Sequence, residues 1–178
     1  MSKMMSSPPI IGKLVSLHSK SKSDASHEYI WKKDAELAAL NGQLPLNDSF
    51  EQYLTNLKTA QDDPLSHKWF SIKTLSDKQY IGYCTIYNID WDATEAHVGI
   101  TIGDRRYWGQ GYGEDSIKTL ANHAFHCLGM HRLHLKTLER NARAQKCFQK
   151  CGFKPCGSIL ERANTYILMQ LRIQDYVK

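Results

Sequence analysis

The fold is decided by the stretch Arg106-Tyr107-Trp108-Gly109-Gln110-Gly111-Tyr112-Gly113-Glu114, which joins a predicted strand to a predicted helix. Glycines at alternate positions let the backbone approach a ligand closely. The free N–H groups at a helix start, with the positive end of the helix dipole, favour a phosphate group. A flexible strand-to-helix turn is the alternative interpretation. A P-loop is excluded because no Gly-Lys-Ser/Thr ending follows, and a Rossmann loop is disfavoured because no repeated βαβ units surround the glycines.

The elements on either side of this stretch have clear periodicity. Alternate residues are apolar over 95–102, which predicts a strand with two different faces. The apolar face holds Ala96, Val98, Ile100 and Ile102, and the other face holds Glu95, His97, Gly99 and Thr101. Apolar residues then recur at helical spacing from Ile117 to Leu128, and Gly129 ends the predicted helix.

The rest of the chain alternates between strand and helix patterns. Further strands are predicted at residues 10–17, 68–74, 79–87, 131–138, 153–161 and 165–171. Further helices are predicted within 28–40, from about 50 to 57 with Asn47 or Asp48 as the cap, and after a capping Asn141. We therefore predict one α/β domain (α+β) over residues 10–178, after a flexible leader at 1–9. It should hold a mixed central sheet of about six to seven strands flanked by helices.

Composition agrees with a single soluble domain. The chain has 178 residues, of which 42% are hydrophobic and 23% charged, which argues against disorder, collagen-like repeats and coiled coils. The net charge of +5 is spread along the chain without a long run of like charges. A nucleic-acid partner is therefore not expected, whereas an anionic cofactor suits this charge well.

The sequence predicts a cytoplasmic protein without a membrane partner. No apolar stretch approaches the roughly 20 residues of a membrane span, and residues 1–9 lack the apolar run of a signal peptide. The five cysteines are too few and irregular for a disulfide framework, and we interpret them mainly as small buried hydrophobic residues. They are Cys84, Cys127, Cys147, Cys151 and Cys156. Because no C-x-x-C or H-x-x-x-H pair occurs, we do not expect a metal site.

Several segments together resemble the GNAT N-acetyltransferases, and within them the RimJ/RimL-like branch. That family carries Arg or Gln, two residues, Gly, one residue, then Gly or Ala, which Arg106, Gly109 and Gly111 match. Residues 96–100, 129–133 and 141–153 are similar to the strands and the closing motif around that loop, and residues 10–15 and 31–36 show weaker similarity. The resemblance covers nearly the whole chain.

The resemblance implies acetyl-CoA as the co-substrate. Its pyrophosphate would bind backbone N–H groups from Trp108 to Glu114, and its pantetheine arm would pair like a strand beside residues 99–102. Asn141 would reach the cofactor arm in addition to capping its helix. Arg105, Arg143, Lys146 and Lys150 are candidates for the CoA phosphates, or solvated surface charges. The implied cofactor residues are Gly99, Ile100, Thr101, Ile102, Arg106, Trp108, Gly109, Gln110, Gly111, Tyr112, Gly113, Glu114, Asn141 and Lys146.

The implied reaction is direct attack of a primary amine on the thioester in a ternary complex. An alkylamine with a pKa near 10 is about 99.9% protonated at pH 7, so a base must remove its proton. His97 occupies the strand position where the branch often carries a glutamate, and histidine suits this role. Glu95 lies on the same strand face and would assist or replace it. The alternative for His97 is a half-buried sheet residue, and His123, His126 and His134 are expected to be solvated.

One residue departs from the family pattern. Many of these enzymes carry a tyrosine as the general acid where this chain has Phe148, so another group or water must protonate the leaving thiolate. The neighbouring Cys147 is expected to belong to the core. Phe148 keeps open a second interpretation, a non-catalytic acyl-CoA-binding module of the same fold.

The amine acceptor is not decided by these motifs. A protein N-terminus and a small-molecule amine both fit, and residues 37–53 should build the acceptor pocket. The positive net charge argues against a polycation, unless an acidic patch overrides it. The candidates for such a patch are Asp34, Glu36, Asp48 and Glu51. We expect a monomer or a homodimer.

Overall fold

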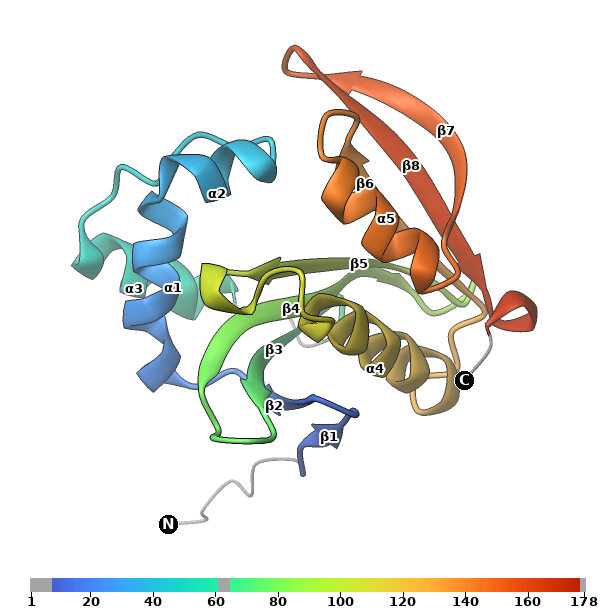
Figure 1. The fold of residues 1–178 in the computed structure, drawn as a ribbon, viewed down its shortest axis with the longest axis horizontal. Coiled ribbons are helices and arrows are strands. Elements are labelled where there is room, and N and C mark those ends of the chain that lie inside the picture. Colours follow the sequence, from blue (N-terminus) through green and yellow to red (C-terminus); the bar gives the residue numbers. More distant parts are fainter. Residues whose placement is uncertain (1–7, 61–64, 177–178) are drawn as a thin grey trace.

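The computed structural model describes residues 8–60 and 65–176, which form one mixed sheet of eight strands with helices packed around it (Figure 1). The strand order is β1-β2-β3-β4-β5-β6-β8-β7. The strands are β1 (Ile10–Ile11), β2 (Val15–Ser19), β3 (His67–Thr74), β4 (Tyr80–Asp90), β5 (Glu95–Ile102), β6 (Arg132–Leu138), β7 (Lys154–Glu161) and β8 (Asn164–Arg172). The helices are α1 (Ala25–Lys33), α2 (Ala35–Leu40), α3 (Phe50–Ala60), α4 (Tyr112–His126) and α5 (Ala142–Lys150).

The α/β prediction is confirmed, with two local differences. The first predicted strand is divided into β1 and β2, which pair antiparallel through a turn at Gly12 and supply the eighth strand. Helix α3 is capped by Ser49 rather than by Asn47 or Asp48. The Ser49 hydroxyl accepts from the N–H of Gln52 at 3.2 Å, and the Gln52 side chain accepts from the N–H of Ser49 at 2.8 Å. This reciprocal capping box satisfies two N–H groups that a single cap would leave open. Most of the predicted leader, residues 1–7, lies outside the described residues.

The sheet divides between β5 and β6. All other neighbouring strands are antiparallel, whereas β5 and β6 are parallel and pair only from Glu95–His97 to Arg132–His134. Beyond His97 the two strands separate, and β6 turns away with β8 and β7 (Figure 1). The β5 edge from residue 98 onward therefore keeps backbone groups that can bind a ligand.

Helix α4 covers one face of the sheet with its apolar side. Ile117, Leu120 and Ala124 on this side are at most 1% exposed. They belong to one core with β2, β4, β5 and β6. Helix α1 packs at the β3–β4 hairpin, where Asp24 accepts from the Ser71 hydroxyl at 2.6 Å. The apolar contacts of α4 hold this helix against the sheet.

One carboxylate ties α4 to the β1–β2 turn. Asp115 accepts from the backbone N–H groups of Lys13, Leu14 and Val15 at 3.0, 2.7 and 3.0 Å. We expect Asp115→Ala to lower the free energy of unfolding by about 2–4 kcal/mol, because three N–H groups lose a charged acceptor. The melting temperature, measured by calorimetry, should fall by roughly 5–15 °C. Glu139→Ala removes an exposed carboxylate and is the control, and equal melting temperatures for the two variants would contradict this role for Asp115.

Candidate functional site

The loop between β5 and α4 is shaped for an anionic ligand. Gly109 and Gly111 have φ angles of +71° and +88°, which side chains other than glycine rarely adopt. The first backbone bond of α4 runs from the Asp115 N–H to the Gly111 carbonyl at 2.9 Å. The N–H groups of residues 112–114 precede this bond and have no acceptor within the helix. The loop therefore presents backbone donors at the positive end of the α4 dipole.

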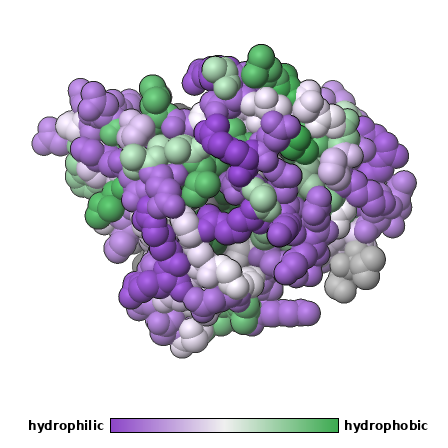
Figure 2. Space-filling view, turned by 45° about the horizontal axis from the view of Figure 1, so that its top comes forward, coloured by the Kyte–Doolittle hydropathy of each residue, from purple (hydrophilic) through white to green (hydrophobic). Residues whose placement is uncertain are grey.

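A cavity of about 420 Å³ lies beside this loop, in the gap between β5 and β6. Its lining includes most of the predicted cofactor residues. They are Gly99, Ile100, Thr101, Ile102, Trp108, Gly109, Gly111, Gly113, Glu114, Asn141 and Lys146. In the space-filling view of Figure 2 the surface is hollowed near the middle, where hydrophobic side chains lie among hydrophilic ones. Segments far apart in the sequence thus share one cavity.

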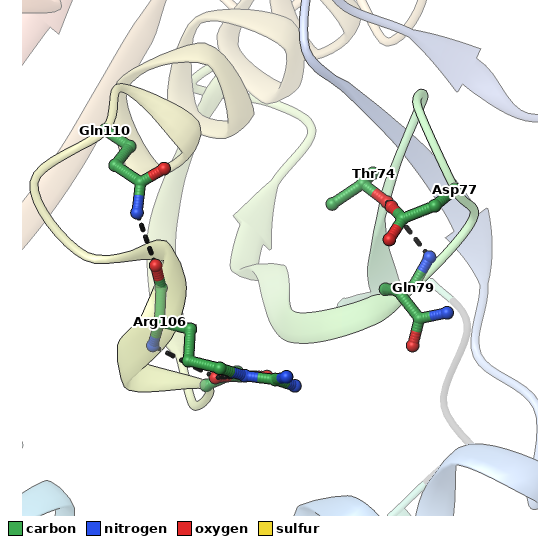
Figure 3. A network of polar contacts seen from close by, with 6 residues as sticks. Thr74, Asp77, Gln79, Arg106 and Gln110 are labelled. Carbon is green, nitrogen blue, oxygen red and sulfur yellow. Dashed lines mark hydrogen bonds and ion pairs between the residues drawn. The ribbon is translucent and has the colours of Figure 1, made fainter.

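Three predicted cofactor residues do not line this cavity: Arg106, Gln110 and Tyr112. The Arg106 guanidinium pairs with Asp104 at 2.6 Å, and the Gln110 side chain donates to the Arg106 carbonyl (Figure 3). Tyr112 packs edge-on against Tyr107, with ring centroids 5.1 Å apart. Their side chains stabilise the loop instead, while the Trp108 N–H is already bonded to the Arg105 carbonyl at 3.1 Å.

Helix α5 brings three cations to the same cavity: Arg143, Lys146 and Lys150. The Arg143 guanidinium lies over the Trp108 ring, 3.6 Å from its centroid. Arg105, the fourth candidate, does not line the cavity and instead binds Asp34 and Glu36 at 2.7 Å each. This contact holds the pKa of Asp34 below its usual value. Most of the positive charge of the cavity therefore comes from α5, and Lys136 of β6 adds one more cation to its lining.

Asn141 caps α5, as the sequence predicted, and Phe148 lies within this helix. The Asn141 side chain caps the helix by accepting from the Ala144 N–H at 3.1 Å, and it donates to the Leu40 carbonyl at 3.3 Å. Phe148 is 7% exposed and lines the cavity, so no phenol proton is available there. Cys147 is half-buried and also lines the cavity rather than belonging wholly to the core. A hydrogen bond from Cys151 lowers the pKa of the Cys147 thiol.

A second cavity, of about 470 Å³, opens on the other face of the sheet. Its walls include the aromatic residues Trp69, Tyr83, Tyr87 and Tyr166. The two cavities share residues of β4 and β5 and of three other segments: Tyr87, Gly99, Ile100, Thr101, Asn41, Lys136 and Tyr166. A Cβ at Gly99 would lie 3.4 Å from the Thr85 methyl group and 3.7 Å from the Tyr87 ring, so this position shared by the two cavities carries no side chain between them and those groups. Two ligands can therefore meet at Gly99 from opposite faces.

His97 lies two residues before Gly99 on the same strand face, next to the cavities but outside their lining. Its ring lies between those of Tyr87 and His134, with centroids 5.4 and 5.3 Å away. Its Nδ1 is buried without a hydrogen-bond partner among the described residues. Burial, and secondarily the electrostatic influence of His134 and Lys136, lower the pKa of His97. This shift favours the neutral ring, which is the form that can accept a proton.

The Glu95 carboxylate is engaged with two partners on β6. It accepts from His134 Nε2 at 2.9 Å and pairs with Arg132 at 3.2 Å. The expectation that His134 is solvated was therefore wrong, because the parallel pairing of β5 and β6 places it opposite His97. His123 is also half-buried, edge-on to Phe70, whereas His126 is exposed.

The second cavity was largely missed from the sequence. Its aromatic residues come from β3, β4 and β8, which are distant in sequence from the glycine-rich loop. The alternation within those strands was a usable signal, since Trp69 pairs with Thr85 and Thr85 with Gly99 on one face. The predicted acceptor region contributes Asn41, Gly42 and Gln43, but Tyr53 lies in the core instead.

Two cysteines differ from expectation. Cys127 and Cys156 are exposed, whereas Cys84 and Cys151 are buried as predicted, and all five thiols are free. Across residues 8–60 and 65–176, no cluster of three or more His, Cys, Asp or Glu side chains is arranged to hold a metal ion. Within the same ranges, no helix combines the length and apolar character needed to cross a membrane.

Comparison with known proteins shows which family the sequence matches. The family model described as "Acetyltransferase (GNAT) domain" matches residues 16–154. The "Probable N-acetyltransferase YjcK" of Bacillus subtilis (strain 168) is 29% identical over 89 residues, and the match spans 49% of this chain and 49% of that protein, about half its length.

Solved structures from Vibrio cholerae share the fold. A spermidine N-acetyltransferase in complex with CoA and spermine superposes with a TM-score of 0.83 at 19% identity, covering 93% of this chain and 99% of that one. A dodecameric structure of a spermidine N-acetyltransferase has a TM-score of 0.75 at 18% identity, covering 93% of this chain and 97% of that one.

Proposed function

Because the chain belongs to the GNAT acetyltransferase family, we propose that it transfers an acetyl group from acetyl-CoA to a primary amine by direct attack in a ternary complex. The observation that carries this proposal is the meeting of two cavities at Gly99, one beside the glycine-rich loop and one walled by aromatic residues. The acceptor is a protein N-terminus or a small-molecule amine. The related fold of a protein solved with CoA and spermine supports an amine acceptor.

Acetyl-CoA would occupy the first cavity. The N–H groups of residues 112–114 are suited to its pyrophosphate, and Arg143, Lys146 and Lys150 to its phosphate charges. The β5 edge after His97, where β6 separates, is suited to the amides of the pantetheine arm, as in strand addition. The thioester would then lie near Gly99.

His97 would act as the general base. It lies beside Tyr87, which lines both cavities, so one water molecule would connect the imidazole with an amine held near Gly99. The amine gives its proton to that water as His97 takes one, and its lone pair attacks the thioester carbon. Collapse of the tetrahedral intermediate breaks the C–S bond and forms the amide. Since Phe148 has no acidic proton, water would protonate the released thiolate.

Acetyl-CoA binding is the first test. At about 100 times its dissociation constant, the cofactor should stabilise the fold by about 2.7 kcal/mol, which raises the melting temperature by roughly 5–10 °C. Differential scanning fluorimetry measures this shift, with adenosine as the ligand control. No shift at millimolar acetyl-CoA would overturn the assignment.

Turnover then separates the enzyme from a binding module. Sustained thiol release with any amine establishes transfer. A melting shift without release across peptides and small amines would favour the acyl-CoA-binding module, which the buried Phe148 keeps as the second candidate.

We also propose the bounds of the domain, its branch of the family, its location in the cell and its oligomeric state. We place the acetyltransferase domain at residues 10–178 and the chain in the RimJ/RimL-like branch, on the motif formed by Arg106, Gly109 and Gly111. Five free thiols suit the reducing cytoplasm. We propose a monomer or a homodimer, and light scattering at several concentrations would distinguish these from a larger assembly.

A further inference from the structure

The cavity on the acceptor side carries positive charge. Three cations line it, Lys32, Lys136 and Arg162. Among the described residues in its lining, Glu161 is the one carboxylate, and it forms an ion pair with Lys136. A cavity with this balance repels a polyamine and attracts a ligand with an anionic group.

The aromatic walls already hold cations of the protein itself. Lys20 Nζ lies 4.9 Å from the Trp69 ring centroid, and Lys32 Nζ lies 5.7 Å from that of Tyr83. Lys136 Nζ lies 4.9 Å from the Tyr166 ring. The cation–π interactions that would recognise a substrate ammonium group are therefore largely occupied.

The acidic side chains near the cavity are also neutralised. Glu28 is 1% exposed and pairs with Lys20 at 2.6 Å and with Lys32 at 3.7 Å. Asp34 and Glu36, two members of the predicted acidic patch, both bind Arg105. No unpaired carboxylate among these residues remains for a second ammonium group of the acceptor.

Two buried polar atoms in the cavity wall point to an oxygen-bearing ligand. The Trp69 indole Nε1 and the Thr85 hydroxyl are buried without hydrogen-bond partners among the described residues. Both residues line the second cavity. An indole N–H only donates, so a carboxylate oxygen would satisfy it, whereas an ammonium group would not.

We propose that the acceptor is a small amino acid: a primary amine that also carries a carboxylate, bound by Lys32 and the Trp69 indole N–H. This inference rests on the proposed acetyl transfer and names its substrate class. A cavity of about 470 Å³ is within the range of small-molecule sites. The amine would lie at Gly99 and the carboxylate toward Lys32, away from the thioester. The carboxylate is attached at the α-carbon or at the far end of the chain, and the experiment distinguishes these forms.

Matched ligand pairs isolate the carboxylate. L-phenylalanine is compared with L-phenylalaninamide, and 5-aminopentanoate with 1,5-diaminopentane, with spermidine and a short neutral peptide as further acceptors. Both kcat/KM with acetyl-CoA and binding to the CoA-loaded protein by calorimetry are measured. We expect at least one carboxylate ligand to exceed its partner by about tenfold or more in both measurements, the effect of one charge-assisted hydrogen bond.

Two variants test whether Lys32 and Trp69 bind the carboxylate of the acceptor. Lys32→Gln should lower kcat/KM for the preferred amino acid by about tenfold without changing the acetyl-CoA melting shift. Lys33→Gln makes the same charge change on the next residue of α1, outside the cavity, and should match the wild type. Trp69→Phe keeps an aromatic wall but removes the indole N–H, and it should weaken the same ligand.

The two proposals fail in different ways. Loss of thiol release with every amine would reject acetyl transfer, while calorimetry with the CoA-loaded protein would still test the acceptor class. If the melting shift itself is absent, acetyl transfer is rejected and calorimetry with the free protein tests the acceptor class. The amino-acid acceptor would be overturned if neither carboxylate ligand bound more tightly than its matched partner, phenylalaninamide or diaminopentane. It would also be overturned if spermidine or the peptide bound as tightly as the better carboxylate ligand. Equal effects of Lys32→Gln and Lys33→Gln would overturn it as well.

Discussion

We expect His97→Ala to lower turnover by about 100-fold to 10,000-fold and to leave acetyl-CoA affinity nearly unchanged, because the imidazole is the proposed proton acceptor and lies outside the cavity proposed for the cofactor. Steady-state kcat at saturating acetyl-CoA and the cofactor melting shift are the two measurements. The melting temperature of the free variant checks that the fold survives.

The pH dependence of the rate tests in which protonation state His97 acts. His97 works only when neutral, so the rate should rise with pH as this residue loses its proton. Burial lowers the pKa of His97 below 6.5, which places that limb of the profile on the acidic side of pH 6.5. The limb should disappear in His97→Ala. A second rise at higher pH, from the amine itself, should remain in both proteins.

Glu95→Gln is the control for the other candidate base. Glu95 bonds to His134 and Arg132, so this variant should reduce turnover less than His97→Ala does. A His97→Ala enzyme within about threefold of the wild type, with the same pH profile, would place the proton acceptor at Glu95 or bulk water, since losses of a general base are normally far larger.

Gly113→Val should abolish most acetyl-CoA binding while the fold persists. A Cβ at Gly113 would lie 3.7 Å from Cys147 Sγ and 3.8 Å from Ile102, which are ordinary contacts. The valine side chain would then occupy the cofactor cavity beside the N–H groups of α4. If the dissociation constant rises about 100-fold, the stabilisation by the same acetyl-CoA concentration falls from about 2.7 to about 0.4 kcal/mol.

Gly157→Val is the matched control for this substitution. Gly157 lies on β7, outside both cavities, and a Cβ there would be 3.8 Å from Leu168. This variant should keep the full cofactor shift. Gly111→Val is a less clean test, because a φ of +88° strains any side chain there whether or not a ligand binds. A wild-type shift in Gly113→Val would remove the cofactor from this cavity.

Individual strands and helices could be predicted from the sequence because the patterns that indicate them lie within short stretches of the chain. The alternation over residues 95–102 predicted β5 with its bounds, and the apolar stripe from Ile117 predicted α4. Hydrophobic periodicity reports which side of an element is buried, and this depends on neighbours in the chain. The family motif marked the glycine-rich loop for the same reason, since Arg106, Gly109 and Gly111 lie within six residues of one another.

The side-chain partners were decided only by the tertiary structure. Glu95 bonds to His134 across 39 residues of chain, and Arg105 binds Asp34 across 71. Nothing in the sequence near Arg105 distinguishes a phosphate ligand from an ion-pair partner, because the outcome depends on which helix packs beside it.

The sequence by itself determined the α/β class, the order of elements and the glycine-rich loop, through short-range periodicity and backbone requirements. The tertiary structure alone decided where β5 and β6 separate, and therefore that two cavities meet at Gly99. It also decided the charge of the second cavity, because Lys32, Lys136 and Arg162 come from α1, β6 and the β7–β8 turn. Strand register and packing bring these cations together, and no local pattern encodes that convergence.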